Sequence, residues 1–126
     1  MNNKNIIIKV RGIIIHENKL LIVRHKDTNF MALPGGHLEY GEDVIACLER
    51  ELTEELGVTP EIGRLLYINT FKINNQFVEF FFEVKNGEKY LNIDGLERTH
   101  AHELAEILWV STDSNMEILP LSLIHI

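Results

Sequence analysis

Apolar side chains recur three and four residues apart in the middle of the chain, at Ile45, Leu48, Leu52 and Leu56. This spacing places them along one side of an α-helix, which turns once about every 3.6 residues. Gly57 follows directly and suits the left-handed backbone that commonly ends a helix. The pattern therefore predicts an amphipathic helix over residues 42–56.

Strand-like segments lie on both sides of this helix, as two pairs: residues 6–15, 19–25, 62–72 and 76–85. The polar turn His16-Glu17-Asn18 separates the first pair, and Asn74-Asn75 lies within the second, so that each pair predicts a β-hairpin. Residues 106–111 have the composition of a further strand. Strands that alternate with a helix along the chain indicate an α/β or α+β fold.

Residues 27–41, between the first hairpin and the helix, read as a loop. They contain Leu33-Pro34-Gly35-Gly36, in which the proline ends a strand and the glycines permit positive φ or close backbone approach. We expect this loop and the start of the helix to lie side by side.

Length and composition narrow the class of protein. The chain has 126 residues and 45% hydrophobic content, which fits one domain with one core. Its apolar runs are too short for a signal-peptide core or a membrane span, so that a cytoplasmic location is expected. The net charge of −7 argues against binding to extended nucleic acid. Cys47, the single cysteine, falls on the apolar side of the helix and is read as a buried thiol rather than a nucleophile.

The predicted helix carries an unusual concentration of glutamates. Glu51, Glu54 and Glu55 are three and four residues apart and therefore share one face, where like charges repel. Taken alone, such a segment is most simply a solvated acidic face. The residues around it change that interpretation.

Nine residues of the loop and helix fall at a fixed spacing: Gly36, Glu42, Arg50, Glu51, Leu52, Glu54, Glu55, Gly57 and Val58. They fit the pattern G-x5-E-x7-R-E-U-x-E-E-x-G-U, where U is aliphatic, and this segment resembles a complete Nudix box. The preceding hairpin, Leu33-Pro34-Gly35 and Glu106-Ile107-Leu108-Trp109-Val110 are also similar to the family's layout. The resemblance covers most of the chain and is weakest after Ser111.

The resemblance implies an α/β fold, a Nudix-type α/β/α sandwich with a mixed sheet, over residues 1–120. It also implies a metal-dependent pyrophosphohydrolase that cleaves a nucleoside diphosphate linked to another moiety, such as a nucleoside triphosphate or ADP-ribose. The reaction would be in-line attack of water on phosphorus. The chemistry agrees, because Mg²⁺ or Mn²⁺ binds through carboxylates together with substrate phosphates.

The family's roles can be carried onto the box residues. Glu51, Glu54 and Glu55 would ligate the metal, with the carbonyl group of Gly36 as an additional ligand. Arg50 would orient the carboxylates. Glu42, near the helix N-terminus, is expected to steady the loop rather than to bind the ion.

The general base stays open between two sources. Glu54 lies within the box, whereas Glu103 lies in the loop before the Trp109 strand, and Glu97 and Glu106 are weaker alternatives.

Substrate contacts are also left open. Arg24 and Lys26 precede the metal loop and would meet phosphate, or else are exposed charges at the end of a strand. Phe30, Tyr67 and Phe71 would stack on a base, although core packing is the better interpretation of all three.

Two other functions stay open. Some Nudix domains sense nucleotides without cleaving them, but those usually lack box carboxylates that this chain retains. Hydrolysis of RNA 5′ ends would favour a basic surface, which this composition does not supply. We expect a small nucleotide substrate and no membrane partner, and a homodimer stays open.

The C-terminal residues after Pro120, Leu121-Ser122-Leu123-Ile124-His125-Ile126, interrupt the expected layout where a C-terminal helix would continue. The codons CTG TCT CTT ATA CAC ATC encode these six residues and resemble a sequencing adapter. We therefore expect a non-native tail at 121–126 and a C-terminal helix cut short.

Overall fold

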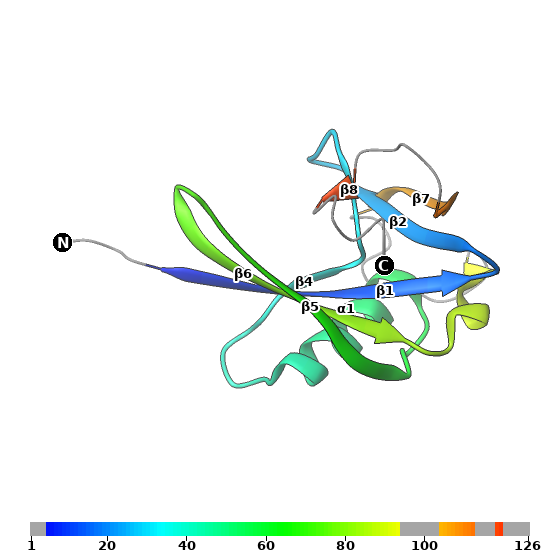
Figure 1. The fold of residues 1–126 in the computed structure, drawn as a ribbon, viewed down its shortest axis with the longest axis horizontal. Helices are drawn as coiled ribbons and strands as arrows, with labels where there is room; N and C mark the ends of the chain where they lie inside the picture. Colours follow the sequence, from blue (N-terminus) through cyan, green and yellow to red (C-terminus); the bar gives the residue numbers. More distant parts are fainter. Residues whose placement is uncertain (1–4, 94–103, 113–117, 120–126) are drawn as a thin grey trace.

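The computed structural model of the chain describes residues 5–93, 104–112 and 118–119. Its elements in chain order are β1 (Ile6–His16), β2 (Lys19–His25), β3 (Met31–Ala32), β4 (Gly35–His37), α1 (Val44–Leu56), β5 (Ile62–Ile73), β6 (Asn75–Val84), the 3₁₀-helix η1 (Gly87–Tyr90), β7 (Leu104–Ser111) and β8 (Ile118–Leu119). Figure 1 shows the long strand β1 running through the centre, with the β5–β6 hairpin crossing it.

The described strands form one mixed sheet in the order β5-β6-β1-β2-β3-β8, while β4 pairs with β1 and β7 with β2. The pairing of β1 with β6 is parallel and runs from Ile6 opposite Gln76 to Ile14 opposite Val84. The pairings of β1 with β2 and of β5 with β6 are antiparallel. The prediction of an α/β fold with a mixed sheet is therefore confirmed.

Both predicted hairpins are present, with strand ends within one residue of expectation. The first turn consists of Glu17 and Asn18, which have φ of 49° and 63°. Two successive positive φ values match the type I′ turn, whose twist suits a hairpin. In the second hairpin, Asn74 alone separates the strands, with φ of 64°.

The expectation that residues 27–41 form only a loop is wrong in part, because β3 and β4 lie within them. β4 adds to β1 so that Gly36 faces Val10 and Gly35 faces Arg11. At Gly35 the backbone has φ of 145°, and a side chain there would collide with the Val10 carbonyl oxygen. The glycine pair thus permits the chain to approach β1 closely beside the helix.

Helix α1 begins at Val44, two residues later than predicted, because Asp43 acts as its N-cap. The Asp43 carboxylate accepts a hydrogen bond of 2.8 Å from the Ala46 amide. The predicted C-cap is confirmed: Gly57 has φ of 81°, and its amide donates to the Thr53 carbonyl oxygen. Ile45 is 38% exposed, so the buried stripe begins at Cys47 rather than at Ile45.

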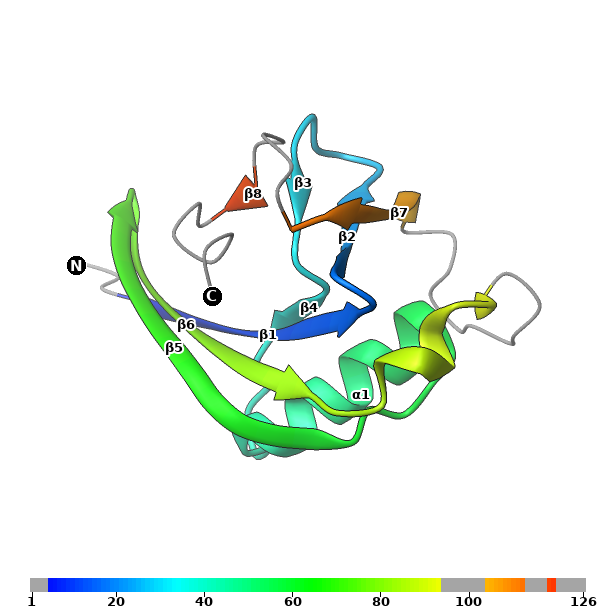
Figure 2. The same cartoon turned by 45° about the vertical axis from the view of Figure 1, so that its right-hand side comes forward.

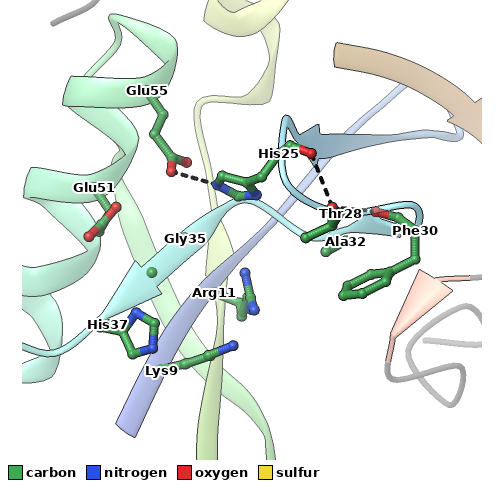
Figure 3. A pocket seen from close by; sticks show the side chains of 11 residues that line it. Lys9, Arg11, His25, Thr28, Phe30, Ala32, Gly35, His37, Glu51 and Glu55 are labelled. Carbon is green, nitrogen blue, oxygen red and sulfur yellow. Dashed lines mark hydrogen bonds and ion pairs between the residues drawn. The ribbon is translucent and has the colours of Figure 1, made fainter. Parts of the chain in front are cut away.

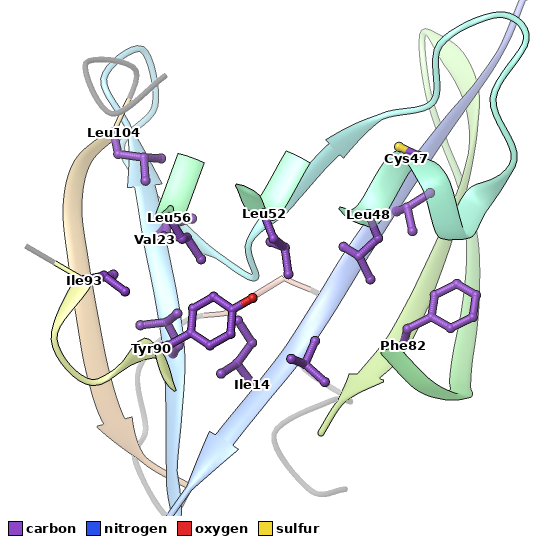
Figure 4. Packing of buried hydrophobic residues seen from close by; sticks show 13 residues of the cluster. Ile14, Val23, Cys47, Leu48, Leu52, Leu56, Phe82, Tyr90, Ile93 and Leu104 are labelled. Atoms are coloured by element: carbon purple, nitrogen blue, oxygen red, sulfur yellow. The ribbon is translucent and has the colours of Figure 1, made fainter. Parts of the chain in front are cut away.

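Helix α1 packs beneath the sheet, as Figure 2 shows, and the main core lies between them. Leu48, Leu52 and Leu56 have no exposed surface, and burying each side chain contributes about 1.5 to 3 kcal/mol. Figure 4 shows this cluster around Tyr90, whose hydroxyl donates to the Val58 carbonyl oxygen at 2.8 Å. Cys47 is buried as expected, and burial raises the pKa of its thiol to about 12.

The opposite face of the sheet carries a second buried cluster: Ile13, Leu20, Ile22, Met31, Leu33 and Phe81. Successive residues of a strand point to opposite faces, so Ile22 belongs to this cluster while Leu21 and Val23 belong to the first. Within the described ranges, α1 is the one α-helix. The expected second helical layer and the tail at 121–126 lie outside these ranges.

Candidate active site

The acidic face of α1 lies against β4 and the residues that follow it. Glu51 is close to Gly36: a side-chain carbon at Gly36 would lie 2.5 Å from the Glu51 carboxyl carbon. The Gly36 carbonyl oxygen faces the same helix, 4.0 Å from the Cys47 sulfur. The structure thus brings together the Gly36 backbone and a helix carboxylate.

Arg50 is the hub of one group of carboxylates. Its guanidinium donates two hydrogen bonds to Glu42, of 3.1 and 2.8 Å, and further bonds to Glu51 and Glu54, of 3.1 and 3.4 Å. A fifth bond, of 3.2 Å, reaches the His37 carbonyl oxygen. Because a guanidinium pairs with a carboxylate in a rigid two-pronged geometry, Arg50 fixes the loop to the helix.

Glu42 holds the loop that precedes the helix. Its carboxylate accepts from the Arg50 guanidinium and from the Glu39 amide at 2.9 Å. The hydrogen bonds from Arg50 lower the pKa of Glu42 to about 2 from its usual 4.5. Both oxygens of Glu42 are thus engaged in holding the loop.

Glu55 lies in a different environment, since it is only 2% exposed. Its Oε1 is 3.0 Å from His25 Nε2 at the end of β2, and among the described residues its buried Oε2 has no hydrogen-bond partner. A buried carboxylate oxygen without a partner is energetically costly and calls for an explanation. Burial, followed by repulsion from Glu55, also raises the pKa of nearby Glu51.

These two glutamates line a cavity of about 320 Å³ whose lining residues are Lys9, Arg11, His25, Thr28, Phe30, Ala32, Gly35, Gly36, His37, Glu51 and Glu55. Figure 3 shows Glu51 and Glu55 reaching into it from α1, while Lys9 and Arg11 reach into it from β1. The cavity is therefore acidic on its helix side and basic on its sheet side.

The sheet side has its own ion pair. Arg11 is 9% exposed, and its Nε lies 3.1 Å from Glu79 Oε2, while Nη1 donates to the Leu33 carbonyl oxygen at 3.0 Å. The Lys9 ammonium group lies 5.4 Å from the centre of the Phe77 ring. Burial lowers the pKa of Lys9, and the charge of Arg11 adds to this effect.

The residues on the helix side fit a divalent cation. Within the described ranges no three acidic, imidazole or thiol side chains yet converge as a complete ion-binding group, because Glu51 and Glu54 turn toward Arg50. Glu51, Glu55 and Gly36 line the same cavity and offer oxygen donors, and Glu55 Oε2 has no hydrogen-bond partner among the described residues. Hard cations such as Mg²⁺ prefer such oxygens.

The predicted substrate cations lie apart from the cavity lining. The Arg24 Nε is 2.7 Å from Glu106 Oε1, and Nη1 donates to the Thr28 carbonyl oxygen, so that Arg24 ties β2 to β7. Lys26 is exposed beyond β2 and is not among the lining residues. The proposed bases Glu97 and Glu103 lie outside the described residues.

The three aromatic candidates differ in position. Phe30 is 46% exposed and lines the cavity, so core packing does not describe it. Phe71 stacks on Phe77 with ring centres 4.8 Å apart, and Tyr67 contacts Phe81 at 5.8 Å. Of the three, Phe30 is the one placed to meet a ligand in this cavity.

This combination of loop, helix and carboxylates is shared with known proteins. The NUDIX domain family matches residues 8–123, which is most of the chain. The chain belongs to the NUDIX family. Within the described ranges, no helix has the length and apolar character needed to cross a bilayer.

Individual NUDIX relatives match to different extents. The ADP-ribose pyrophosphatase of Methanocaldococcus jannaschii is 42% identical over 62 residues, which cover 47% of this chain and only 37% of that protein. The MutT-like protein of Streptomyces ambofaciens is 31% identical over 113 residues, covering 87% of this chain and 67% of the relative. The crystal structure of a MutT protein from Methanosarcina mazei has a TM-score of 0.77 at 25% identity, covering 99% and 92% of the two chains.

Reasoning from the NUDIX box missed the sheet side of the cavity, namely Lys9 and Arg11, and the contact of His25 with Glu55. A usable signal was present for the first pair. Two cations at alternate positions within the apolar run Ile6–Ile15 must share one face of a strand. By contrast, His25 and Glu55 are 30 residues apart, and no local pattern connects them.

Proposed function

We propose that this NUDIX protein is a divalent-metal-dependent pyrophosphohydrolase that cleaves a nucleoside diphosphate linked to another moiety, of the nucleoside triphosphate or ADP-ribose type. The observation that carries the proposal is the buried Glu55, with one oxygen held by His25 and the other lacking a hydrogen-bond partner within the described residues. Such an oxygen, beside a second buried glutamate in a cavity, is suited to a cation.

Glu51, Glu54 and Glu55, with the Gly36 carbonyl, would hold Mg²⁺ or Mn²⁺. Held there, such an ion would supply positive charge for an in-line displacement at phosphorus. Arg50 keeps the Glu51 and Glu54 carboxylates in place through the hydrogen bonds described above.

Glu54 is our candidate for the general base. Its side chain is 25% exposed, and its hydrogen bond from Arg50 is the longest of that group at 3.4 Å. A carboxylate that is accessible to water can accept a proton from the attacking water. Glu103 is the second candidate.

Phe30 offers an exposed ring on which a base can stack at the cavity wall. The relative named ADP-ribose pyrophosphatase supports ADP-ribose as one of the two substrate types that we propose. A nucleotide sensor is the second candidate, and turnover distinguishes the two.

The test is a panel of nucleoside triphosphates and ADP-ribose, incubated with Mg²⁺ or Mn²⁺ and with or without chelator. We expect release of a nucleoside monophosphate that chelator abolishes. Glu54→Gln should lower kcat by at least about 100-fold while the thermal unfolding temperature stays near that of the parent protein. The matched control is Glu49→Gln, which removes an exposed carboxylate from the same helix and should leave turnover unchanged. Tight binding across the panel without turnover would support the sensor instead.

A further inference from the structure

The sheet side of the cavity carries charge that the proposed metal chemistry does not use. Lys9 and Arg11 lie two residues apart on β1 and therefore on the same face of the sheet. Glu79 of β6 is in register with Lys9, but its carboxylate is bound by Arg11. Two cations and one carboxylate leave this wall with one positive charge in excess.

Arg11 is a poor candidate for the group that meets a ligand. It is nearly buried, paired with Glu79 and bonded to the Leu33 carbonyl oxygen, so that its hydrogen-bonding capacity already serves the fold. A buried ion pair of this kind is strongly disrupted by removal of either partner. Arg11 thus positions Glu79, and the excess charge of the wall belongs to Lys9.

Lys9 is differently placed. Among the described residues its ammonium group forms no ion pair, and it lies over the Phe77 ring, 5.4 Å from the ring centre. The side chain is half-buried and lines the cavity. A desolvated cation facing a cavity gains more from an incoming anion than a solvated one does, because its charge is poorly screened.

Resting on the proposed function, we infer that Lys9 is a specificity-determining residue, which binds a substrate phosphate beyond the cleaved linkage and so favours nucleoside triphosphates over ADP-ribose. Cleavage of a triphosphate between its first and second phosphates leaves a third, strongly anionic phosphate to be bound. In ADP-ribose the corresponding position is an uncharged ribose. The carboxylate wall would attract phosphates that carry a bound cation, and Lys9 is a separate positive charge. This combination suits a nucleoside triphosphate, which carries the additional phosphate.

The experiment compares the parent protein with Lys9→Met and Lys9→Arg. Methionine keeps an unbranched apolar stem that can remain on Phe77, whereas arginine keeps the positive charge. Lys19→Met is the matched control, since Lys19 is exposed on β2 and is absent from the cavity lining. Each variant is first checked for an unchanged thermal unfolding temperature.

We expect Lys9→Met to raise KM for nucleoside triphosphates by about tenfold or more, which corresponds to loss of one charge-assisted hydrogen bond. The KM for ADP-ribose should change less than about threefold, and Lys9→Arg should restore triphosphate binding. Calorimetric titration with a non-hydrolysable triphosphate analogue in the presence of Mg²⁺ should show the same loss of affinity, without relying on turnover.

Equal losses for both substrates, or no loss for either, would overturn the inference. A parent protein that cleaves ADP-ribose but neither cleaves nor binds triphosphates would also overturn it, while leaving the proposed function intact. If the parent protein cleaves neither substrate, the proposed function fails. The analogue titration then still decides whether Lys9 binds the anion.

Discussion

Two groups of charges meet on one face of α1, and they differ in how completely their carboxylate oxygens are hydrogen-bonded. Around Arg50, the carboxylates of Glu42, Glu51 and Glu54 all receive hydrogen bonds. Around Glu55, a carboxylate with 2% exposure has only His25 against one oxygen and, among the described residues, nothing against the other. The carboxylates of the first group are hydrogen-bonded by one guanidinium, whereas the second group leaves a buried carboxylate oxygen without a partner among the described residues.

This difference separates stability from binding within a single helix. The bonds from Arg50 hold the loop against α1 and stabilise the folded chain whether or not an ion is bound. If Glu55 binds a metal ion as we propose, its environment should gain stability when the ion is bound. We therefore expect variants of the Glu55 environment to lose turnover and metal binding, and variants of the Arg50 group to lose stability.

Glu55→Gln should have the largest effect, lowering pyrophosphohydrolase turnover by more than about 100-fold, because loss of the metal ligand that we propose should exceed the 10- to 100-fold effect of residues that only orient a ligand. Without metal, the free energy of unfolding of this variant should stay within about 1 kcal/mol of the parent value. The substitution removes the repulsion between Glu55 and Glu51, and this gain offsets the cost of burying the glutamine amide. In the parent protein, Mg²⁺ at 100 times its Kd should add about 2.7 kcal/mol to that free energy. Denaturant titrations with and without Mg²⁺ measure both quantities, and an equal gain in the variant would contradict the contrast.

The second effect concerns His25, whose imidazole holds Glu55 Oε1 at 3.0 Å. His25→Ala should weaken Mn²⁺ binding by about 10- to 100-fold, because residues that orient a metal ligand typically contribute that much. Electron paramagnetic resonance of free Mn²⁺ measures the affinity directly. His16→Ala is the control, because His16 ends the other strand of the same hairpin, β1, and does not line the cavity. An unchanged affinity in His25→Ala would show that Glu55 needs no support.

The smallest effect belongs to the Arg50 group. Glu42→Gln should lower the free energy of unfolding by about 1 to 2 kcal/mol at neutral pH, since one charge-assisted pair is lost and solvent screens part of it. The pKa of Glu42 is about 2 in the folded chain against a usual 4.5. Its contribution is therefore complete above about pH 4.5 and is lost as the pH falls toward 2.

Urea titrations between pH 7 and pH 3 check this prediction, and the parent protein and Glu42→Gln should converge as the pH falls. Divergence toward low pH would contradict it. The variant should also retain metal-induced stabilisation, which Glu55→Gln should lose. The two variants thus separate the two charge groups in one assay.

The NUDIX box predicts the acidic helix because the box is local: a cap, an apolar stripe and three glutamates lie within a few turns. The first residue of the helix was less predictable, because the side chain of Asp43 caps the helix and ends it there, so that Glu42 stays outside. The depth of Glu55 and its contact with His25 arise from packing between distant segments, which no local spacing records. Ile45 shows the same limit: it lies in the helix as predicted, but its side chain is exposed rather than buried.

The charged side chains on the sheet side of the cavity were harder to predict than the box helix, for the same physical reason. Arg24 adjoins the loop along the chain, which suggests a contact with substrate phosphate. In the structure its guanidinium is paired with Glu106 across the sheet. Lys9 and Arg11 belong to the first strand and enter the cavity only because β4 and β6 flank that strand. Which cation is left uncompensated depends on Glu79, 68 residues from Arg11 along the chain.

The parallel pairing of β1 with β6 also has a consequence for how the chain is made. The two strands meet along nine register pairs, from Ile6 with Gln76 to Ile14 with Val84. At about 5 to 20 residues per second, the ribosome needs roughly 4 to 14 seconds to progress from one strand to the other. The helix can form within that interval, whereas one edge of β1 must wait for its partner. For those seconds the nascent chain exposes an apolar strand edge, which makes synthesis, rather than the folded state, the period of greatest risk of aggregation.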